Sequence, residues 1–353
     1  MKFHHVENLS RRTPFMPILM RKFFSALSFM VVLGIGNIQA QTATQLEQVG
    51  YLLGDALFYA DKYITPITDA AVYQASSSWM LSPEKKKTGK VTVGLHANMF
   101  FVPKSDRKFN ISNDDFLFFE IENQTQASVP SALGNDQTIF LVGDLDGEQI
   151  RLETPEGVDM ETIVYPYLTA AVALPYGTEL VVRYSTKTKL KRGYYQVYGL
   201  GIQHNVSQYF SKLKDKKIDL AYMLMYSNEE VGFDFLDVDT PYGNLGINKI
   251  TGFVNTWHFQ CSAAKTWGKT QLMGSIIGNR SFFEYKVSGT RGEIEEVLPV
   301  QSTINNLLTT IADPKTNIMG EVACRYQINK IYLQSSVAFG KFVNANIGVH
   351  YQL

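Results

Sequence analysis

The last eleven residues of the chain, 343–353, alternate without an error between apolar and polar side chains. Every second position from Val343 to Leu353 is apolar or aromatic, and the positions between them are Asn, Gly, His or Gln. A period of two gives a β-strand one apolar and one polar face. In an exported chain, such a strand at the very end is typical of a closed barrel in a bacterial outer membrane.

The N-terminal region predicts that export. Arg21 and Lys22 precede an apolar run at residues 23–35, and Ile38-Gln39-Ala40 fits a small-residue cleavage site. The run is shorter than the roughly 18 residues that a membrane-spanning helix needs. We expect residues 1–40 to be a cleaved signal peptide, with Met20 as the natural initiator and a mature chain that begins near Gln41.

The same alternation recurs in at least six segments of about ten residues, a length that suits a tilted strand crossing a bilayer. We expect strands near residues 90–103, 114–122, 163–174, 178–186, 192–203, 216–227, 250–264, 268–286, 318–328, 330–340 and 342–353. A soluble sandwich of two sheets also alternates, but its strands are usually five or six residues long. Aromatic side chains also gather toward the strand ends, as the girdles of a membrane barrel require.

Bacterial barrels normally have an even number of strands with both termini in the periplasm. A twelfth strand is therefore expected within residues 138–153, and fourteen strands are the alternative. With twelve, the connections at 175–177, 264–268 and Asn329 are periplasmic, whereas 228–249, 287–317 and the short turn at Gly340-Lys341 are extracellular. The predicted fold class is all-β, a closed antiparallel transmembrane β-barrel at 90–353.

Two segments have helical rather than strand periodicity. Apolar residues from Leu46 to Ala60 recur at helical spacing, and so do those from Val206 to Leu213. The first helix belongs to an N-terminal segment, 41–89, which either plugs the lumen or stays in the periplasm. The second helix is expected at the interface or at the pore mouth on the periplasmic side. For each helix, simple packing on the barrel rim is the alternative.

The polar face of each predicted strand supplies the candidate site. Its lumen-facing residues are His96, Asn98, Tyr165, Tyr167, Glu179, Arg183, His258, Glu321, Arg325, Asn344, Asn346 and His350. An isolated charge in an apolar environment is costly, so the four charged members should pair or line water. Either they form ion pairs that fill a closed lumen, or they border a path for a solute.

Other chemistry has little support in the sequence. His258 and Ser262 share a strand face and His204 precedes Ser207, but neither pair has an orienting third residue, and the familiar hydrolase and metalloprotease motifs are absent. We expect no enzyme, metal site or cofactor. The two cysteines, Cys261 and Cys324, are expected to be inert packing residues or, less favourably, a disulfide. Without residues 1–40 the net charge is near −4, which gives no reason to expect nucleic acid.

Residues 174–183 (LPYGTELVVR), 201–209 (GIQHNVSQY) and 101–106 (FVPKSD) resemble an uncharacterised family of Bacteroidetes outer-membrane barrels. That family carries an Asn-Gly-Trp segment before its first strand, whereas here Ser77-Ser78-Trp79 keeps only the tryptophan. In architecture, a helix ahead of a mid-sized barrel is similar to the long-chain fatty-acid transporter family. That likeness implies uptake of hydrophobic compounds but transfers no ligand contacts.

We therefore expect an outer-membrane barrel that passes a small, hydrophobic compound. The alternative is a non-transporting structural or secretion-associated barrel. The expected partners are the lipid bilayer and, through the C-terminal strand, the barrel-assembly machinery. A transporter should show a continuous cavity or an apolar lateral opening, whereas a structural barrel should have a lumen packed shut.

Overall fold

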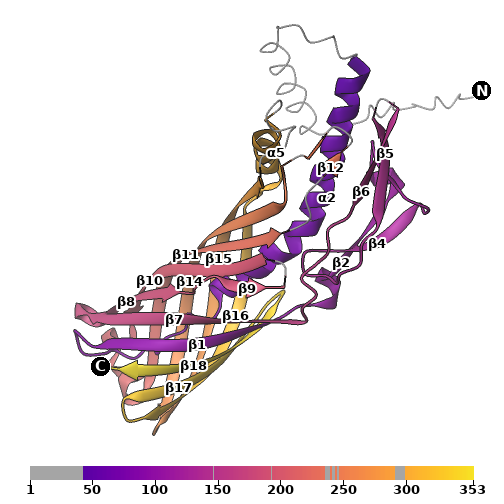
Figure 1. Cartoon of the computed structure of the whole chain (residues 1–353). Helices are drawn as coiled ribbons and strands as arrows, with labels where there is room; N and C mark the ends of the chain where they lie inside the picture. Colours follow the sequence, from indigo (N-terminus) through magenta and orange to yellow (C-terminus); the bar gives the residue numbers. More distant parts are fainter. Residues whose placement is uncertain are drawn as a thin grey trace, which may run out of the picture. The chain divides into compact units, whose positions relative to one another are not determined.

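In the computed structural model, ten antiparallel strands pair into a closed ring (Figure 1). Polar and apolar residues alternate along each of them, so one face can line the inside while the other faces outward. The ring runs in the order β11 (Ile218–Asp234), β14 (Lys249–Trp267), β15 (Thr270–Ser288), β16 (Lys315–Ile328), β17 (Ile331–Phe339), β18 (Val343–Gln352), β1 (Val91–Phe101), β7 (Thr162–Leu174), β8 (Thr178–Tyr184) and β10 (Gly193–Asn205), and β10 pairs back with β11. Because the sheet closes on itself, the fold is a barrel and the two-sheet sandwich is wrong.

The structure describes residues 43–145, 147–191, 193–234, 239–240, 243–244, 246–290 and 299–353. The expected signal peptide, its cleavage site and the start near Gln41 lie outside the described residues. The description below concerns Gln48–Leu353, which form one unit.

The barrel has ten strands rather than the expected twelve or fourteen. The segments expected as strands at 114–122 and 138–153 belong instead to an insert, residues 102–161, between β1 and β7. In the insert, β2 (Lys108–Ser112) pairs with β4 (Gln126–Pro130), and β3 (Glu120–Ile121), β5 (Phe140–Leu145) and β6 (Glu148–Glu153) form a second small sheet. Residues 138–153 alternate because they fold as a hairpin with one face packed on the apolar core that the insert shares with α2, and Gly147 in its turn adopts the left-handed conformation.

Short strands outside the ring complete the β-structure. β9 (Thr188–Leu190) pairs with the end of β10, and β12 (Asp239–Thr240) pairs with β13 (Gly243–Asn244). The strand directions place the connections 175–177, 268–269 and 329–330 at the same end as the C-terminus. The ends of β1, β11 and β15, from which the insert and the two other long connections begin, lie at the opposite end.

The first helix is longer than the sequence periodicity indicates. α2 (Ala43–Ser76) continues past the expected helical stretch and through Pro66. The other helices are α3 (Ser211–Asp215) and α5 (Val300–Leu308), with single 3-10 turns η1 (Lys104–Asp106), η2 (Asn113–Asp115), η3 (Pro175–Gly177), η4 (Ser207–Tyr209) and η5 (Thr309–Ile311). Among the described residues, none of the helices combines the length and the apolar character needed to span a membrane.

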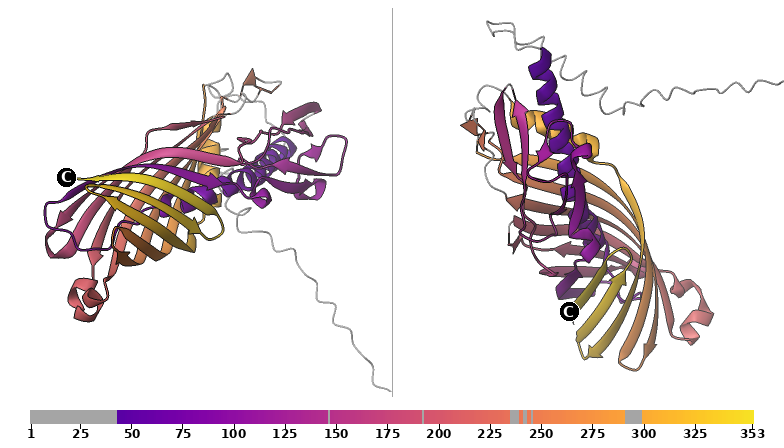
Figure 2. Two further views of the ribbon diagram at one scale, coloured as in Figure 1. Left: turned by 90° about the horizontal axis from the view of Figure 1, so that it is seen from below. Right: turned by 90° about the vertical axis from the view of Figure 1, so that its right-hand side faces the viewer.

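The two faces of the barrel differ as the alternation predicts. On β18, Ile347, Val349 and Tyr351 point outward and are 57%, 47% and 44% exposed. Asn344 and Asn346, on the same strand, point inward and are buried. The right-hand view of Figure 2 shows the last part of α2, in indigo, entering the space that the strands enclose.

Candidate functional site

The structure places all twelve predicted lumen residues on the inner face of the barrel. They come from six strands, and each is buried: His96, Asn98, Tyr165, Tyr167, Glu179, Arg183, His258, Glu321, Arg325, Asn344, Asn346 and His350. His96 stacks on Tyr167 with ring centroids 4.5 Å apart, and His350 meets His96 edge-on at 4.7 Å. The inner face is therefore a packed interior in which these polar side chains lie among apolar ones such as Val181 and Met223.

Residues 77–90, which connect the end of α2 to the start of β1, account for this burial, because residues 77–83 are buried inside the barrel and the Lys86 side chain is buried against its wall. This segment belongs to no helix or strand, so its backbone groups need partners other than a regular ladder. Side chains of the barrel wall supply them. Five carbonyls of the segment accept hydrogen bonds from inward side chains: Ser77 from Arg183 (2.8 Å), Ser78 from Tyr167 (3.3 Å), Met80 from Gln334 (2.8 Å), Ser82 from Gln203 (3.1 Å) and Pro83 from Asn205 (2.5 Å).

The C-terminal end of α2 is docked by three wall residues. Asn344 donates to the Tyr73 carbonyl at 3.1 Å and to the Ser77 hydroxyl at 2.9 Å, and Asn279 donates to the Ser76 hydroxyl at 2.8 Å. Arg183 brings its positive charge to the last turn, where unpaired carbonyls carry partial negative charge. A helix end buried in the lumen is thereby satisfied by the barrel.

The Trp79 side chain holds the segment against the barrel wall, where it contacts Arg183 on β8 and approaches Gly199 on β10. The Arg183 guanidinium lies 4.3 Å from the ring centroids of both Trp79 and Tyr167, so it is sandwiched between two aromatic faces. On the other side, a Cβ on Gly199 would lie 2.8 Å from the Trp79 ring, so β10 needs glycine at this close approach. Trp79 and Arg183 are both 2% exposed.

The expected mutual pairing of the lumen charges is not what the structure shows. Glu179 forms an ion pair with Lys86 at 2.6 Å, and both side chains are buried. Glu321 accepts the Ser78 N–H at 3.2 Å. Arg325 lies 3.7 Å from the Tyr332 ring centroid. The charges of the wall therefore act mainly on the threaded segment, which the strand periodicity does not reveal.

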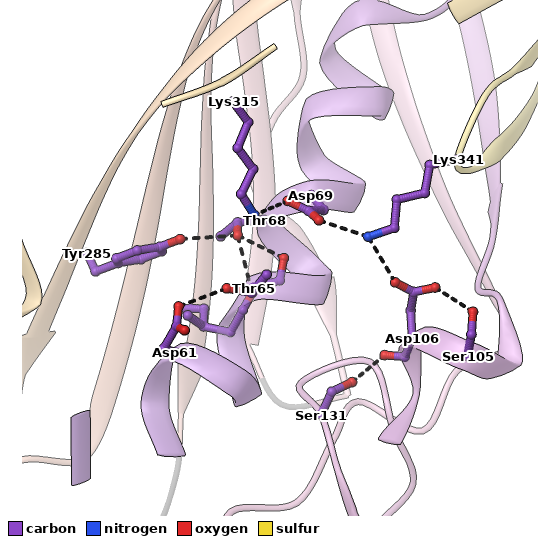
Figure 3. Close-up of polar contacts among 11 residues, drawn as sticks. Asp61, Thr65, Thr68, Asp69, Ser105, Asp106, Ser131, Tyr285, Lys315 and Lys341 are labelled. Carbon is purple, nitrogen blue, oxygen red and sulfur yellow. Dashed lines mark hydrogen bonds and ion pairs between the residues drawn. The ribbon is translucent and has the colours of Figure 1, made fainter. Parts of the chain in front are cut away.

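A second set of contacts fixes α2 at the barrel rim (Figure 3). Asp69 accepts from Lys315 at 2.5 Å and from Lys341 at 2.9 Å, and Lys341 also reaches Asp106 at 3.2 Å. Thr68 is 3.3 Å from the Tyr285 hydroxyl on β15. Partial burial alone would lower the pKa of Lys341, but the carboxylates of Asp69 and Asp106 together raise it. This cluster joins α2, the β17–β18 turn and the insert.

The first half of α2 is bound to the insert. The buried Asp55 carboxylate accepts the backbone N–H groups of Leu117, Phe118 and Phe119 at 2.7–3.1 Å. The Tyr63 hydroxyl donates to the Glu156 carbonyl at 2.7 Å. Apolar residues of α2 and the insert share one core, including Leu57, Ile64, Phe119, Val129 and Leu141. The insert and α2 therefore form one assembly at this end of the barrel.

The two His–Ser pairs that the sequence offers as catalytic candidates do not form, because each residue contacts other side chains. His258 lies 3.0 Å from the Ser227 hydroxyl, and Ser262 accepts from Gln260, whereas His204 contacts Thr178 and Tyr209. No group of three or more His, Cys, Asp or Glu residues that would hold a metal occurs within the described parts of the chain. Cys261 and Cys324 are free and exposed on the outer face.

The sequence profile of a family of unknown function, DUF6588, matches residues 20–353, so the chain belongs to that family. None of the curated proteins matches the sequence. Three solved structures show limited similarity. Ail, the attachment invasion locus protein of Yersinia pestis, has 7% identity and a TM-score of 0.28, with coverage of 76% of this chain and 100% of Ail. The copper transporter OprC has 6% identity and a TM-score of 0.23, with coverage of 76% and 38%. The translocator domain of the autotransporter NalP from Neisseria meningitidis has 11% identity and a TM-score of 0.18, with coverage of 81% and 94%. At these TM-scores the likenesses carry no argument about function.

Proposed function

We propose that this member of the DUF6588 family is an outer-membrane β-barrel closed by its own residues 77–83. In this proposal the barrel is a membrane anchor. It holds the assembly of α2 and the insert at the end opposite the C-terminus. The observation that carries the proposal is the capping of the threaded segment's carbonyls by side chains of the lumen wall.

The outer face supports placement in a membrane. Each of the ten strands carries large apolar or aromatic side chains that are at least 36% exposed, from Leu95 on β1 through Ile276 on β15 to Val349 on β18. Soluble monomers rarely expose contiguous apolar surface of this kind. Hydrocarbon tails would cover it, and the alternation apolar-out and polar-in is that of outer-membrane barrels.

The end with the C-terminus would face the periplasm, as both ends of bacterial barrel domains normally do. Short connections then lie on the periplasmic side, where they belong, and the insert and residues 48–68 of α2 are at the cell surface. The chain reaches that surface through its own lumen, since residues 77–90 connect the docked end of α2 to the periplasmic start of β1.

A closed lumen favours anchoring over free passage. Wall residues that contact residues 76–86 through hydrogen bonds or an ion pair come from eight of the ten strands: Asn98 (β1), Tyr167 (β7), Arg183 (β8), Gln203 (β10), Asn279 (β15), Glu321 (β16), Gln334 (β17) and Asn344 (β18). Between α2, β7, β9, β10 and β11 lies a cavity of about 10 Å³, room for about one water.

A second candidate is passage of a small polar solute after residues 77–90 withdraw. It is favoured by the way the segment is held, because hydrogen bonds and one ion pair fix it without any strand pairing. The wall it would leave is rich in Ser, Thr, Asn, Gln and His side chains, with apolar residues such as Val181, Met223 and Met273 between them, so it suits a polar solute better than the hydrophobic compound that the sequence led us to expect.

Two measurements test the anchor. In planar bilayers the full-length protein should insert without conductance steps, and steady open steps would contradict a closed lumen. In intact cells, an external protease should cleave the insert, whose Leu117 is 67% exposed. An insert that resists cleavage until the outer membrane is opened would contradict the orientation.

A further inference from the structure

The connection between β10 and β11 carries an unusual combination of exposed side chains. Tyr209 and Phe210 are 65% and 57% exposed, although aromatic rings of this size are normally covered. Exposed lysines follow at 212, 214, 216 and 217. Figure 2 shows this rose-coloured segment, which includes α3, projecting from the same end of the barrel as the C-terminus.

The backbone of this connection is held firmly while its rings stay outside. Ser207 is buried, and its hydroxyl contacts Asn205 and Asp219 at 3.2 Å. Gln208 donates to the carbonyls of Tyr176 and Asn205, both at 2.7 Å. The exposed rings are therefore fixed in position by the turn beneath them rather than left on a loose loop.

The neighbouring end of β14 extends the same surface. The Thr266 N–H reaches the Lys217 carbonyl at 3.4 Å, and Lys265 lies opposite Ile218 in the sheet. Trp267 is 51% exposed, with the Lys265 ammonium 5.2 Å from its ring centroid. We call the set Tyr209, Phe210, Lys212, Lys214, Lys216, Lys217, Lys265 and Trp267 the rim patch.

The charge of the rim patch is strongly one-sided. Its five lysines outnumber the acids around them, which are Asp215, Asp219 and Glu84, the last within electrostatic reach of Asp219. The Asp219 carboxylate accepts a hydrogen bond from the Ser207 hydroxyl, whereas Asp215, in α3, is exposed. A cationic surface with three exposed aromatic rings matches the headgroup level of a bilayer, where aromatic side chains sit at the interface and lysines attract anionic lipids.

We propose that the rim patch binds the headgroups of anionic phospholipids in the leaflet at the C-terminal end of the barrel. The rings of Tyr209, Phe210 and Trp267 lie at the boundary between headgroups and acyl chains, and the lysines contact the lipid phosphates. This inference rests on the proposed membrane placement of the barrel but not on its closed lumen.

The test is native mass spectrometry of the full-length protein released from nanodiscs of equal phosphatidylcholine and phosphatidylglycerol. The wild type should retain phosphatidylglycerol roughly tenfold over phosphatidylcholine, as several lysines at a membrane surface allow. The variant K212Q/K214Q/K216Q/K217Q should retain the two lipids about equally. The pair variant K216Q/K217Q should fall between them, so the comparison survives if the quadruple variant folds poorly.

The matched control removes the same charge at the same end of the barrel but outside the rim patch. Lys87 and Lys330 are exposed there, and K87Q/K330Q, which removes as much charge as the pair variant K216Q/K217Q, should keep the wild-type preference. Equal retention of both lipids by the wild type, or an equal loss in the control, would overturn the rim patch as a lipid site and leave an acidic protein as its partner. Failure of the wild type to enter nanodiscs would overturn the membrane placement as well.

Discussion

Replacing Arg183 with methionine should loosen the threaded segment without emptying the lumen wall. Methionine keeps an unbranched apolar chain against Trp79 and Tyr167 but removes the guanidinium that lies between their rings. It also leaves the Ser77 carbonyl, which Arg183 reaches at 2.8 Å, without that donor. Glu229 and Glu321 lie within the electrostatic reach of Arg183, so their burial becomes costlier too.

The magnitude follows from these contacts. A hydrogen bond from a charged donor contributes about 1.5–3 kcal/mol, and each buried cation–π contact contributes about 0.5–2 kcal/mol. A total of about 3 kcal/mol is a conservative sum, and every 1.4 kcal/mol is roughly a tenfold change in an equilibrium constant. The segment should therefore leave the lumen roughly 100-fold more often than in the wild type.

Thiol labelling measures this opening. Ser82 is 1% exposed, so Ser82→Cys in a Cys261→Ser/Cys324→Ser background should react slowly with a water-soluble maleimide. Arg183→Met should raise the labelling rate roughly 100-fold, in line with its effect on opening. The control is Arg280→Met, which removes an exposed arginine that lies 5.6 Å from the Phe282 ring. If both variants label at the wild-type rate, Arg183 does not hold the segment.

Three further predictions concern the other contacts. Asp55→Ala should lower the hydrogen-exchange protection of the Leu117, Phe118 and Phe119 amides at least roughly tenfold, because these N–H groups lose a charged acceptor. The protection of β14 amides should not change. Unchanged protection at 117–119 would show that Asp55 does not bind the insert. Glu179→Gln should lower the free energy of unfolding in denaturant by about 3–5 kcal/mol, because it leaves Lys86 buried without its partner. The double variant Lys86→Met/Glu179→Met should recover most of that loss. Strictly additive effects would rule out the coupling between the two residues. The raised pKa of Lys341 makes its stabilising contribution complete below pH 10.5, the ordinary lysine value, and lost as the pH passes through the raised pKa. The difference in melting temperature between the wild type and Lys341→Gln should therefore shrink above that pH, and a constant difference would contradict the cluster.

Much of the barrel is predictable because one physical cause produces its pattern. A closed sheet with one face buried and the other facing outward forces a period of two, so the strand at 342–353 and its outward Ile347 follow from the sequence and appear as β18. The same cause identifies the inward residues of each strand, including Tyr165 on β7 and Glu321 on β16.

The strand count was wrong for a related reason. Residues 138–153 alternate as a barrel strand would, yet they form the β5–β6 hairpin of the insert. Alternation reports one covered face and does not say whether lipid or protein covers it. The left-handed Gly147 and the charged Glu148, Arg151 and Glu153 are the local signals of an exposed hairpin.

The partners of the lumen charges were not predictable from the strands. Residues 77–90 lack any period, so nothing in their pattern places them inside a barrel. Yet Lys86 is the partner of Glu179, and Ser77 and Ser78 are those of Arg183 and Glu321. A tryptophan at position 79, just after a helix, is the sequence feature that points to this segment.

Disulfide trapping tests the threaded lumen most directly. Ser77 and Asn344 are in contact at 2.9 Å, so Ser77→Cys/Asn344→Cys in the Cys261→Ser/Cys324→Ser background should cross-link in isolated membranes under mild oxidation. Ser77→Cys with Ile347→Cys, which faces outward, should not cross-link. A folded double variant that stays reduced in the first pair, or cross-links equally in both, would contradict a lumen filled by residues 77–83.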